Sequence, residues 1–388
     1  MRLSRTVRAK QIRREREKAG LPVYDGGLGE NPSPPPKEII ISIASHVNKH
    51  GYENAMGIDE LQSVLGPRLV LGNGLKPLLA TLQLAFAKLH PRGTIVHIVP
   101  MWLSYREQTT LLELSVTNVE TKYKDDYRVT AADLEGTLSK LEGKPHLVLF
   151  NSPNNPTGYV YSSKEMKEFA SVFEKYQSVV LHDYIYEHII HPSCKDSGDL
   201  SKIYSKCIKG SSLSKNVSCG GYRFGWLIFP DMLEDLWRKC LEIASIQYTC
   251  PTTPLQYVAC DILSADLTPY YRAQSVMFGD VTKLCAKALR EMNLRVSEPE
   301  GAYYLLVDFA AYKDLLLEKG ISDSDGLSEI LCEEIGFITV PGCVFGIKEP
   351  YVVRYSIVDI TEIDHSNGTY NIDRILAFHH ELSKWLAL

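Results

Sequence analysis

The sequence lacks several features that would assign it to a well-defined class of protein. No apolar run approaches the roughly 20 residues that a membrane-spanning helix needs. There is no Walker-type loop, no CxxC pair and no His/Cys/carboxylate cluster at ligand spacing, so we expect no P-loop nucleotide site and no metal site. No internal repeat or low-complexity segment is present, which argues against a repeat architecture.

Charge and cysteine content bear on the binding partners and on the cellular compartment of the protein. The net charge of −5 offers no whole-chain argument for binding nucleic acid or a membrane. The nine cysteines are scattered and odd in number, so we expect reduced thiols and a cytoplasmic location. Residues 2–18 are strongly basic, which is compatible with a nucleic-acid arm or a transit peptide. Because transit peptides usually avoid acids and this segment has Glu15 and Glu17, we interpret it as a charged helix on the protein body or on a partner subunit.

The hydrophobic pattern predicts an α/β domain. Between about residues 68 and 230, longer helical patterns alternate with short apolar runs, which are RLVL, TIVHIV, HLVLF, SVVLH and KCI. Continuous apolar strands alternating with helices indicate a mostly parallel sheet that is covered on both faces. A ligand site is then expected at the carboxyl ends of the strands.

The pattern changes after a long helical region at about residues 231–292. Three strand-like stretches, SEPEGAYYLLVDFA, FITVPG and YVVRYSIVD, precede a closing helix, DRILAFHHELSKWLAL. The first forty residues have no strand–helix rhythm of their own, so we expect them to join this second unit. The prediction is a large α/β domain over residues 41–285 and a discontinuous small α+β domain over residues 1–40 and 286–388.

The first strand end is compatible with an anion site. RLVL is followed by GNGLKP, in which Asn73, Gly74 and Leu75 open a helix. Small residues there allow backbone N–H groups to face an anion, assisted by the helix dipole. A cup for one phosphate and a purely structural turn fit this stretch equally well. A dinucleotide fingerprint fits poorly, because Pro77 occupies the third glycine position and no acid follows about twenty residues later.

The next strand ends each carry a chemically distinct residue. Trp102 can stack on a flat ligand or pack in the core. Asn155, in the rigid turn NSPNNPTG, offers a fixed amide donor, and its bond to proline can be cis. Asp183 ends an apolar run, where it is either a partnered buried acid or a helix N-cap, and Tyr186 follows it.

An amine and a guanidinium reach the same rim. KCI leads into GSSLSK, which brings Lys215, and Arg223 follows eight residues later. A solvated surface lysine is the commoner case, because burying an ammonium is costly. Taken together, however, the rim offers a phosphate cup, a flat aromatic, an amide, an acid, a phenol and an amine. Pyridoxal 5′-phosphate meets each of these through a lysine Schiff base and an acid that faces its pyridine nitrogen.

Along nearly its whole length the sequence resembles the class I/II aminotransferases, the fold-type I enzymes that use pyridoxal phosphate, and especially aspartate aminotransferases. The motifs are, in order, GLGENP, Tyr52 with Gly57, NGLKPLL, PMWLSY, NSPNNPTG, HDYIYE, SSLSK with the later arginine, EGAYYL, VPGCVFG and YVVRYS. The resemblance implies an α/β fold with a mostly parallel seven-stranded sheet in the large domain. It also implies a homodimer with shared active sites and amino transfer from an L-amino acid to a 2-oxo acid, for which we expect 2-oxoglutarate.

The resemblance also implies the roles of individual residues. Lys215 would form the Schiff base and shuttle the proton, and Asp183 would pair with the pyridine nitrogen. Asn155 and Tyr186 would donate to the phenolate oxygen of the cofactor, and Trp102 would stack on its ring.

Two further groups of residues follow from the same motifs. Those implied to bind the phosphate are Ser212, Arg223, Tyr52 of the neighbouring subunit, and the backbone around Asn73, Gly74 and Leu75. Those implied to bind the substrate are Arg354, which would hold the α-carboxylate, and Gly29, Trp102 and Asn155.

The residues that would select the substrate depart from the aspartate pattern. Leu75 stands where bacterial-type aspartate aminotransferases often have a lysine for the distal carboxylate, and we expect the neighbouring Lys76 to point elsewhere. Tyr303, Tyr304 and Tyr248 could shape a pocket for aromatic side chains or simply pack in the core. Two alternatives stay open, a lyase or synthase of the same fold and a catalytically silent cofactor-binding regulator.

Overall fold

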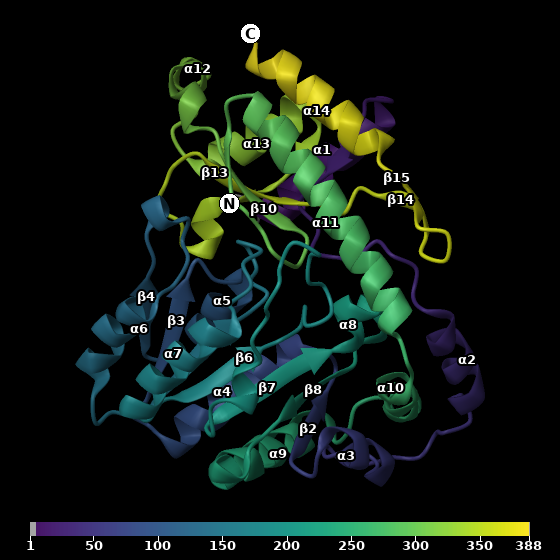
Figure 1. Ribbon diagram of the computed structural model, residues 1–388, viewed down its shortest axis with the longest axis vertical. Coiled ribbons are helices and arrows are strands. Elements are labelled where there is room, and N and C mark those ends of the chain that lie inside the picture. The colour runs from purple at the N-terminus through teal and green to yellow at the C-terminus, as the bar shows by residue number, and fades with distance from the viewer. Residues whose placement is uncertain (1–4, 388) are drawn as a thin grey trace.

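The computed structural model describes residues 5–387, and a seven-stranded sheet forms the lower part of the molecule in Figure 1. The strand order is β2-β8-β7-β6-β5-β3-β4, and every neighbouring pair is parallel except those made by β8. The predicted mostly parallel seven-stranded sheet is thus confirmed. Its strands are β2 (Leu69–Gly72), β3 (Thr94–Val99), β4 (Val116–Glu120), β5 (His146–Asn151), β6 (Val179–Asp183), β7 (Cys207–Ser212) and β8 (Gly225–Ile228).

Alternating side chains of each central strand enter two different cores. In β5, Leu147 and Leu149 pack on one face of the sheet, whereas Val148 and Phe150 pack on the other. Both faces are covered, so every residue of β5 is buried, as a parallel sheet requires. The first face packs against α4 (Leu75–Leu89), α5 (Leu103–Leu111) and α9 (Glu234–Tyr248), and the second against α6 (Ala131–Leu138) and α7 (Ser163–Lys175).

The upper part of the molecule in Figure 1 has a smaller sheet with the order β12-β13-β10-β9. β1 pairs in parallel with β11, which brings the N-terminal segment beside the C-terminal part of the chain. The strands of the four-stranded sheet are β9 (Arg295–Val296), β10 (Tyr304–Asp308), β12 (Val340–Pro341) and β13 (Val352–Ser356). Two further pairs are β1 (Tyr24–Asp25) with β11 (Phe337–Ile338), and β14 (Thr361–Asp364) with β15 (Thr369–Asn371). The domain boundaries proposed from the sequence stay a prediction.

Long helices connect and cover the two parts. The 24-residue helix α11 runs from the large sheet to the small one, and α14 packs beside it at the C-terminus (Figure 1). The bounds are Thr268–Glu291 for α11 and Asp373–Leu386 for α14. The remaining helices are α1 (Arg5–Lys18), α2 (Lys37–His46), α3 (Asp59–Leu65), α8 (Leu213–Asn216), α10 (Thr253–Ser264), α12 (Lys313–Glu318) and α13 (Ser324–Ile335). No helix within residues 5–387 is both long and apolar enough to cross a membrane.

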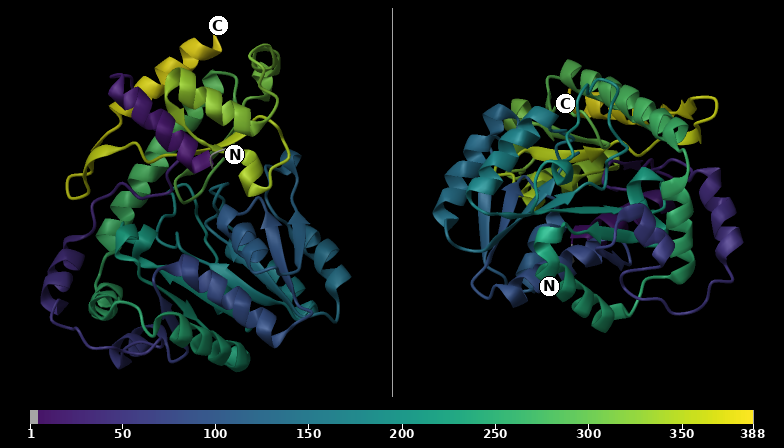
Figure 2. Two further views of the ribbon diagram at one scale, coloured as in Figure 1. Left: turned by 180° about the vertical axis from the view of Figure 1, so that it is seen from behind. Right: turned by 60° about the horizontal axis from the view of Figure 1, so that its bottom comes forward.

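The basic N-terminal segment forms α1 and lies on the protein body. It packs against α13, as the left view of Figure 2 shows, and Arg16 donates from Nη1 to the carbonyl of Glu333 at 2.6 Å. Arg13 forms an ion pair with Asp25 at 3.0 Å. Of the two positions predicted for this charged helix, the body and a partner subunit, the structure therefore shows the first.

Candidate active site

A cavity of about 1820 Å³ opens at the carboxyl ends of β5, β6 and β7, where the α/β topology predicts a ligand site. Residues of the upper part of the molecule also line it, among them Arg354 on β13 and residues 27–30 in the segment before α2. Most of the residues singled out from the sequence line it, and these are Gly29, Leu75, Trp102, Asn155, Asp183, Tyr186, Lys215, Arg223 and Arg354. Asn73, Gly74 and Ser212 lie directly behind this lining, as their contacts below establish, whereas Tyr52 lies apart.

The loop before α4 and the side chain of Arg223 form one compact unit. Arg223 donates from Nη2 to the carbonyl of Asn73 at 3.2 Å. A Cβ on Gly74 would lie only 2.5 Å from that Nη2 atom, so any other residue would strain the backbone at its φ of +89° and displace the Arg223 side chain. Leu75 begins α4, and the first N–H groups of this helix therefore stand beside a guanidinium. This arrangement suits an anion.

Ser212 is the last residue of β7 and lies close to the loop before α4. Its Oγ accepts from the backbone N–H of Ser214 at 3.1 Å, which caps α8. A Cβ on the adjacent Gly225 would come within 3.0 Å of the Ser212 Cβ and 2.7 Å of the Leu75 nitrogen. The glycine thus allows strand β8, the serine and the start of α4 to meet.

Asp183 ends β6 and is only 3 % exposed. Burial raises the pKa of its carboxyl to about 6, although hydrogen bonds from the Tyr105 hydroxyl and the Ile185 backbone act in the opposite direction. Tyr105 donates to Oδ2 at 2.5 Å. The carboxylate is therefore a buried acid with partners, and the helix-cap alternative does not apply.

Sequence reasoning did not single out Tyr105. It lies three residues after Trp102 on α5, and the two rings meet edge-on with their centroids 5.6 Å apart. Residues at this spacing share one face of a helix, so the position of Trp102 at the rim could have pointed to its neighbour.

Lys215 occupies the short helix α8 and is half-buried. Its Nζ donates to the carbonyl of Gly29. Burial lowers the pKa of this amine to about 8; the carboxylate of Glu30 opposes the shift, and the cations of Arg354, Arg223 and Lys76 add to it. A larger share of this amine is thus neutral near pH 7 than for an ordinary lysine, which is what a nucleophilic amine needs.

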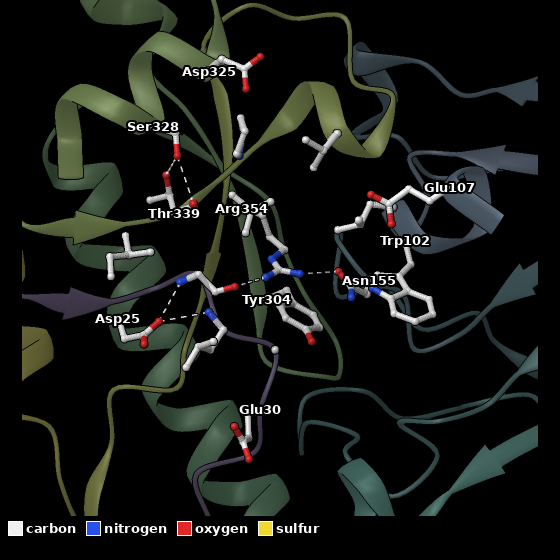
Figure 3. A pocket seen from close by; sticks show the side chains of 18 of the residues that line it. Asp25, Glu30, Trp102, Glu107, Asn155, Tyr304, Asp325, Ser328, Thr339 and Arg354 are labelled. Carbon is white, nitrogen blue, oxygen red and sulfur yellow. Dashed lines mark hydrogen bonds between the residues drawn. The ribbon is translucent and has the colours of Figure 1, made fainter. Parts of the chain in front are cut away.

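Arg354 points from β13 across the cavity toward β5 (Figure 3). It donates from Nη1 to Oδ1 of Asn155 at 3.1 Å and from Nη2 to the carbonyl of Gly27 at 2.7 Å. The Arg354 Nε is buried and has no partner among the described residues. The peptide bond between Asn155 and Pro156 is cis, in line with the sequence expectation. A buried guanidinium with a donor left over can bind a carboxylate.

Four tyrosines lie in the lining of the cavity or next to it. The hydroxyls of Tyr186 and Tyr304 are 2.7 Å apart, and the guanidinium carbon of Arg354 lies 4.5 Å from the centre of the Tyr304 ring. Tyr303 donates to the carbonyl of Gly29 at 3.0 Å. Tyr248 instead donates to the carbonyl of Leu71, behind the lining of the cavity.

The prediction that Lys76 points elsewhere is wrong. Its side chain lines the cavity, and its Nζ lies 4.8 Å from the centre of the Trp102 ring. Side chains of a helix lean toward the N-terminal end, so a long residue in the first turn of α4 reaches back over the strand ends.

Tyr52 does not reach the cavity of its own chain. Its side chain is 91 % exposed, in the segment after α2. The exposed side chains of Ile40, Ile41 and Val47 precede it in the same region.

A family model described as aminotransferase class I and II matches residues 57–366. The aspartate aminotransferase of Thermotoga maritima is 28 % identical over 377 residues, which cover 93 % of this chain and 92 % of the relative. An aromatic-amino-acid aminotransferase of Thermococcus litoralis is 28 % identical over 262 residues, which cover 66 % and 63 % of the two chains.

Solved structures agree with this match at the level of the fold. The crystal structure of the Thermotoga maritima aspartate aminotransferase superimposes with a TM-score of 0.82 and 24 % identity, covering 100 % of this chain and 98 % of the other. The aspartate aminotransferase of Thermus thermophilus in a structure with maleate gives a TM-score of 0.83 at 20 % identity, covering 99 % and 97 %.

Proposed function

The chain belongs to the class I and II aminotransferases, and on that premise we propose that it moves the amino group of an L-amino acid to a 2-oxo acid in two half-reactions. Enzymes of this family use pyridoxal 5′-phosphate, and that is the cofactor of this aminotransferase. The observation that carries the proposal is the meeting of the Lys215 amine, the Asp183 carboxylate and the Arg354 guanidinium in one cavity.

The residues present fit the cofactor. Its phosphate needs an anion site, and the glycine-dependent contact between Gly74 and Arg223 leaves a guanidinium beside the start of α4. We assign Ser212, Tyr52 and the backbone of Asn73 and Leu75 to the same group. The ring would lie against Trp102, and Asn155 and Tyr186 would donate to its phenolate oxygen.

Bound to the enzyme, the cofactor supplies an electron sink for the electrons left on the substrate Cα when its proton departs. Lys215 would bind the cofactor through Nζ and would carry that proton, for which its lowered pKa prepares it. Asp183, as a carboxylate, would hold a proton on the ring nitrogen. Arg354 would bind the substrate α-carboxylate next to Gly29, which orients Cα toward the Lys215 amine.

The function is tested by offering ¹⁵N-labelled L-amino acids one at a time with 2-oxoglutarate. We expect the label to appear in glutamate. Release of labelled ammonia without labelled glutamate would contradict transamination and favour the lyase alternative. Cofactor binding with neither outcome would favour the catalytically silent regulator.

We propose 2-oxoglutarate as the acceptor because Lys76 lines the cavity, where its ammonium can meet a second carboxylate. The named activities of the relatives, on aspartate and on aromatic amino acids, differ in the donor, so we leave the donor to the labelled panel. Tyr304 and Trp102 also line the cavity and are compatible with an aromatic donor.

We further propose a homodimer in which Tyr52 binds the phosphate in the site of its partner. The exposure of this tyrosine and of Ile40 and Ile41 on α2 supports a second copy on this face. The test mixes inactive Lys215→Ala and Tyr52→Ala chains. Because a mixed dimer then holds one native site, a 1:1 mixture should recover about a quarter of the native activity. No recovery despite subunit exchange, or an active monomer on dilution, would contradict the shared site.

The proposed location is the cytoplasm. No cysteine within residues 5–387 forms a disulfide, which supports a reducing compartment.

A further inference from the structure

The carboxylate of Asp183 has a single side-chain partner among the described residues, the hydroxyl of Tyr105. Both residues are almost fully buried, at 3 % and 2 % exposure. An O–H donor to a carboxylate at 2.5 Å is a strong, charge-assisted bond, because the donor stabilises the ionised form directly.

The other titratable groups around Asp183 do not replace this bond. They are His182, the preceding residue of β6, Tyr186 on the following loop, and Lys215 on α8. None of the three donates a hydrogen bond to the carboxylate, since the only other bond comes from the Ile185 N–H to Oδ1 at 3.2 Å. Oδ2 therefore depends on Tyr105.

Tyr105 is itself held in place by buried polar groups of three elements. The hydroxyl of Thr109, one turn later on α5, lies 2.7 Å from the Tyr105 carbonyl oxygen and 2.6 Å from Oε1 of Gln83 on α4, and its single proton can be donated to either. The same hydroxyl is 3.1 Å from Nε2 of His97 on β3. A helix anchored to both neighbours presents its tyrosine in one orientation.

We propose that Tyr105 is a positioning residue whose hydroxyl keeps the Asp183 carboxylate ionised and directed into the cavity, a role that rests on the proposed pairing of Asp183 with the ring nitrogen of the cofactor. Removing the donor leaves a buried carboxylate whose burial already favours the protonated form. The protonated acid can no longer hold a proton on the ring nitrogen.

The first test is Tyr105→Phe in the cofactor-free full-length protein with ¹³C-labelled aspartate. The Asp183 signal, identified by its loss in Asp183→Asn, is titrated with pH. We expect the pKa of this carboxyl to rise by about one pH unit or more. The matched control is Tyr204→Phe, which removes another buried hydroxyl, one bonded to the carbonyl of Ser178 at 2.6 Å in a different core. This control should leave the titration unchanged.

The second test uses the holoenzyme loaded with ¹⁵N-labelled cofactor, where the ring-nitrogen chemical shift reports its protonation. In Tyr105→Phe the shift should move toward the neutral pyridine near pH 7.5, and the affinity for the cofactor should fall about tenfold. An unchanged Asp183 titration together with an unchanged ring-nitrogen shift would overturn the proposal.

A third variant guards against a folding defect in Tyr105→Phe. Incorporation of 3,5-difluorotyrosine at position 105 keeps the shape of the ring and makes the phenol a stronger donor, so the pKa of Asp183 should fall. A rise or no change would count against the proposal. If the chain does not bind the cofactor at all, the proposed function fails, yet the cofactor-free titration still decides the role of Tyr105.

Discussion

The floor of the cavity is formed by strand ends of one sheet, whereas its upper wall is formed by segments from both ends of the chain. We define the floor as Asn155, Asp183, Tyr186 and Lys215, and the wall as Gly27–Glu30, Tyr304 and Arg354. Floor residues end β6 or lie within four residues after β5, β6 and β7, and backbone pairing places these strands. In the wall, the bond from Arg354 to the Gly27 carbonyl joins residues 327 positions apart.

The difference indicates a division of tasks. The floor carries the groups that we propose to bind the cofactor and move the proton, and backbone pairing between parallel strands places them. The wall carries the guanidinium that would bind the substrate carboxylate, and its position depends on how the N-terminal segment packs under β13. Substitutions in the floor should therefore affect cofactor and chemistry, and substitutions in the wall should affect the substrate.

The largest effect is expected in the floor. Lys215→Ala should lower kcat by more than about 10⁴-fold, because both the covalent link and the proton carrier are lost. Steady-state assays, with mass spectrometry after borohydride reduction, check this. Lys206→Ala serves as the control, because the amine of Lys206 bonds Gln177 at the surface and does not line the cavity. Cofactor found on another lysine of the native protein would contradict the assignment.

Arg354→Lys tests the wall. A lysine cannot form the paired hydrogen bonds of a guanidinium, so kcat/KM should fall about 100-fold. The Kd for the cofactor, measured by fluorescence titration, should stay unchanged. An equal loss of cofactor affinity would show that floor and wall do not divide the tasks in this way.

Gly74→Ala tests the anion site formed by the loop before α4 and Arg223. The new Cβ would lie 2.5 Å from Arg223 at a positive φ, so the Kd for the cofactor should rise about tenfold or more. Gly136→Ala is the matched control, since nothing lies within 4 Å of its Cβ position. Unaltered affinity in Gly74→Ala would remove this loop from the phosphate site.

Lys76→Met tests whether a residue of α4 that lines the cavity also binds the substrate. The KM for 2-oxoglutarate should rise roughly fivefold while that for pyruvate, which has no second carboxylate, stays constant. Lys88→Met, at the other end of α4, controls for loss of charge. Parallel changes for both acids would argue against the proposed contact.

The smallest effect concerns pH. Because burial lowers the pKa of Lys215 to about 8, the neutral, reactive fraction of the amine should grow about fivefold from pH 7 to pH 8 and level off above pH 9. The rate of cofactor attachment to the cofactor-free protein, followed by stopped-flow absorbance, measures this. A rate still rising steeply at pH 10 would indicate an ordinary, solvated lysine.

Part of the fold was readable from local pattern. The runs that became β3, β5 and β6 are mostly apolar because both faces of the sheet are covered. β4 escaped detection because Val119 is its only buried residue, so its sequence VTNVE has no apolar run. β8, with the sequence GWLI, is short and lies antiparallel between two strands. The alternation of helices and strands predicts parallel strands, so it did not reveal β8.

The sequence by itself determined the residues of the floor, because each ends a strand or follows one within a few residues, and strand order brings these ends to one edge. Only the tertiary structure decided the contacts between elements. It turned Lys76 into the cavity, joined Arg354 to Asn155 and Gly27, and set Tyr105 against Asp183. These contacts depend on the packing of α4, α5 and β13 onto the sheet, and helix packing depends on side chains far apart in the chain.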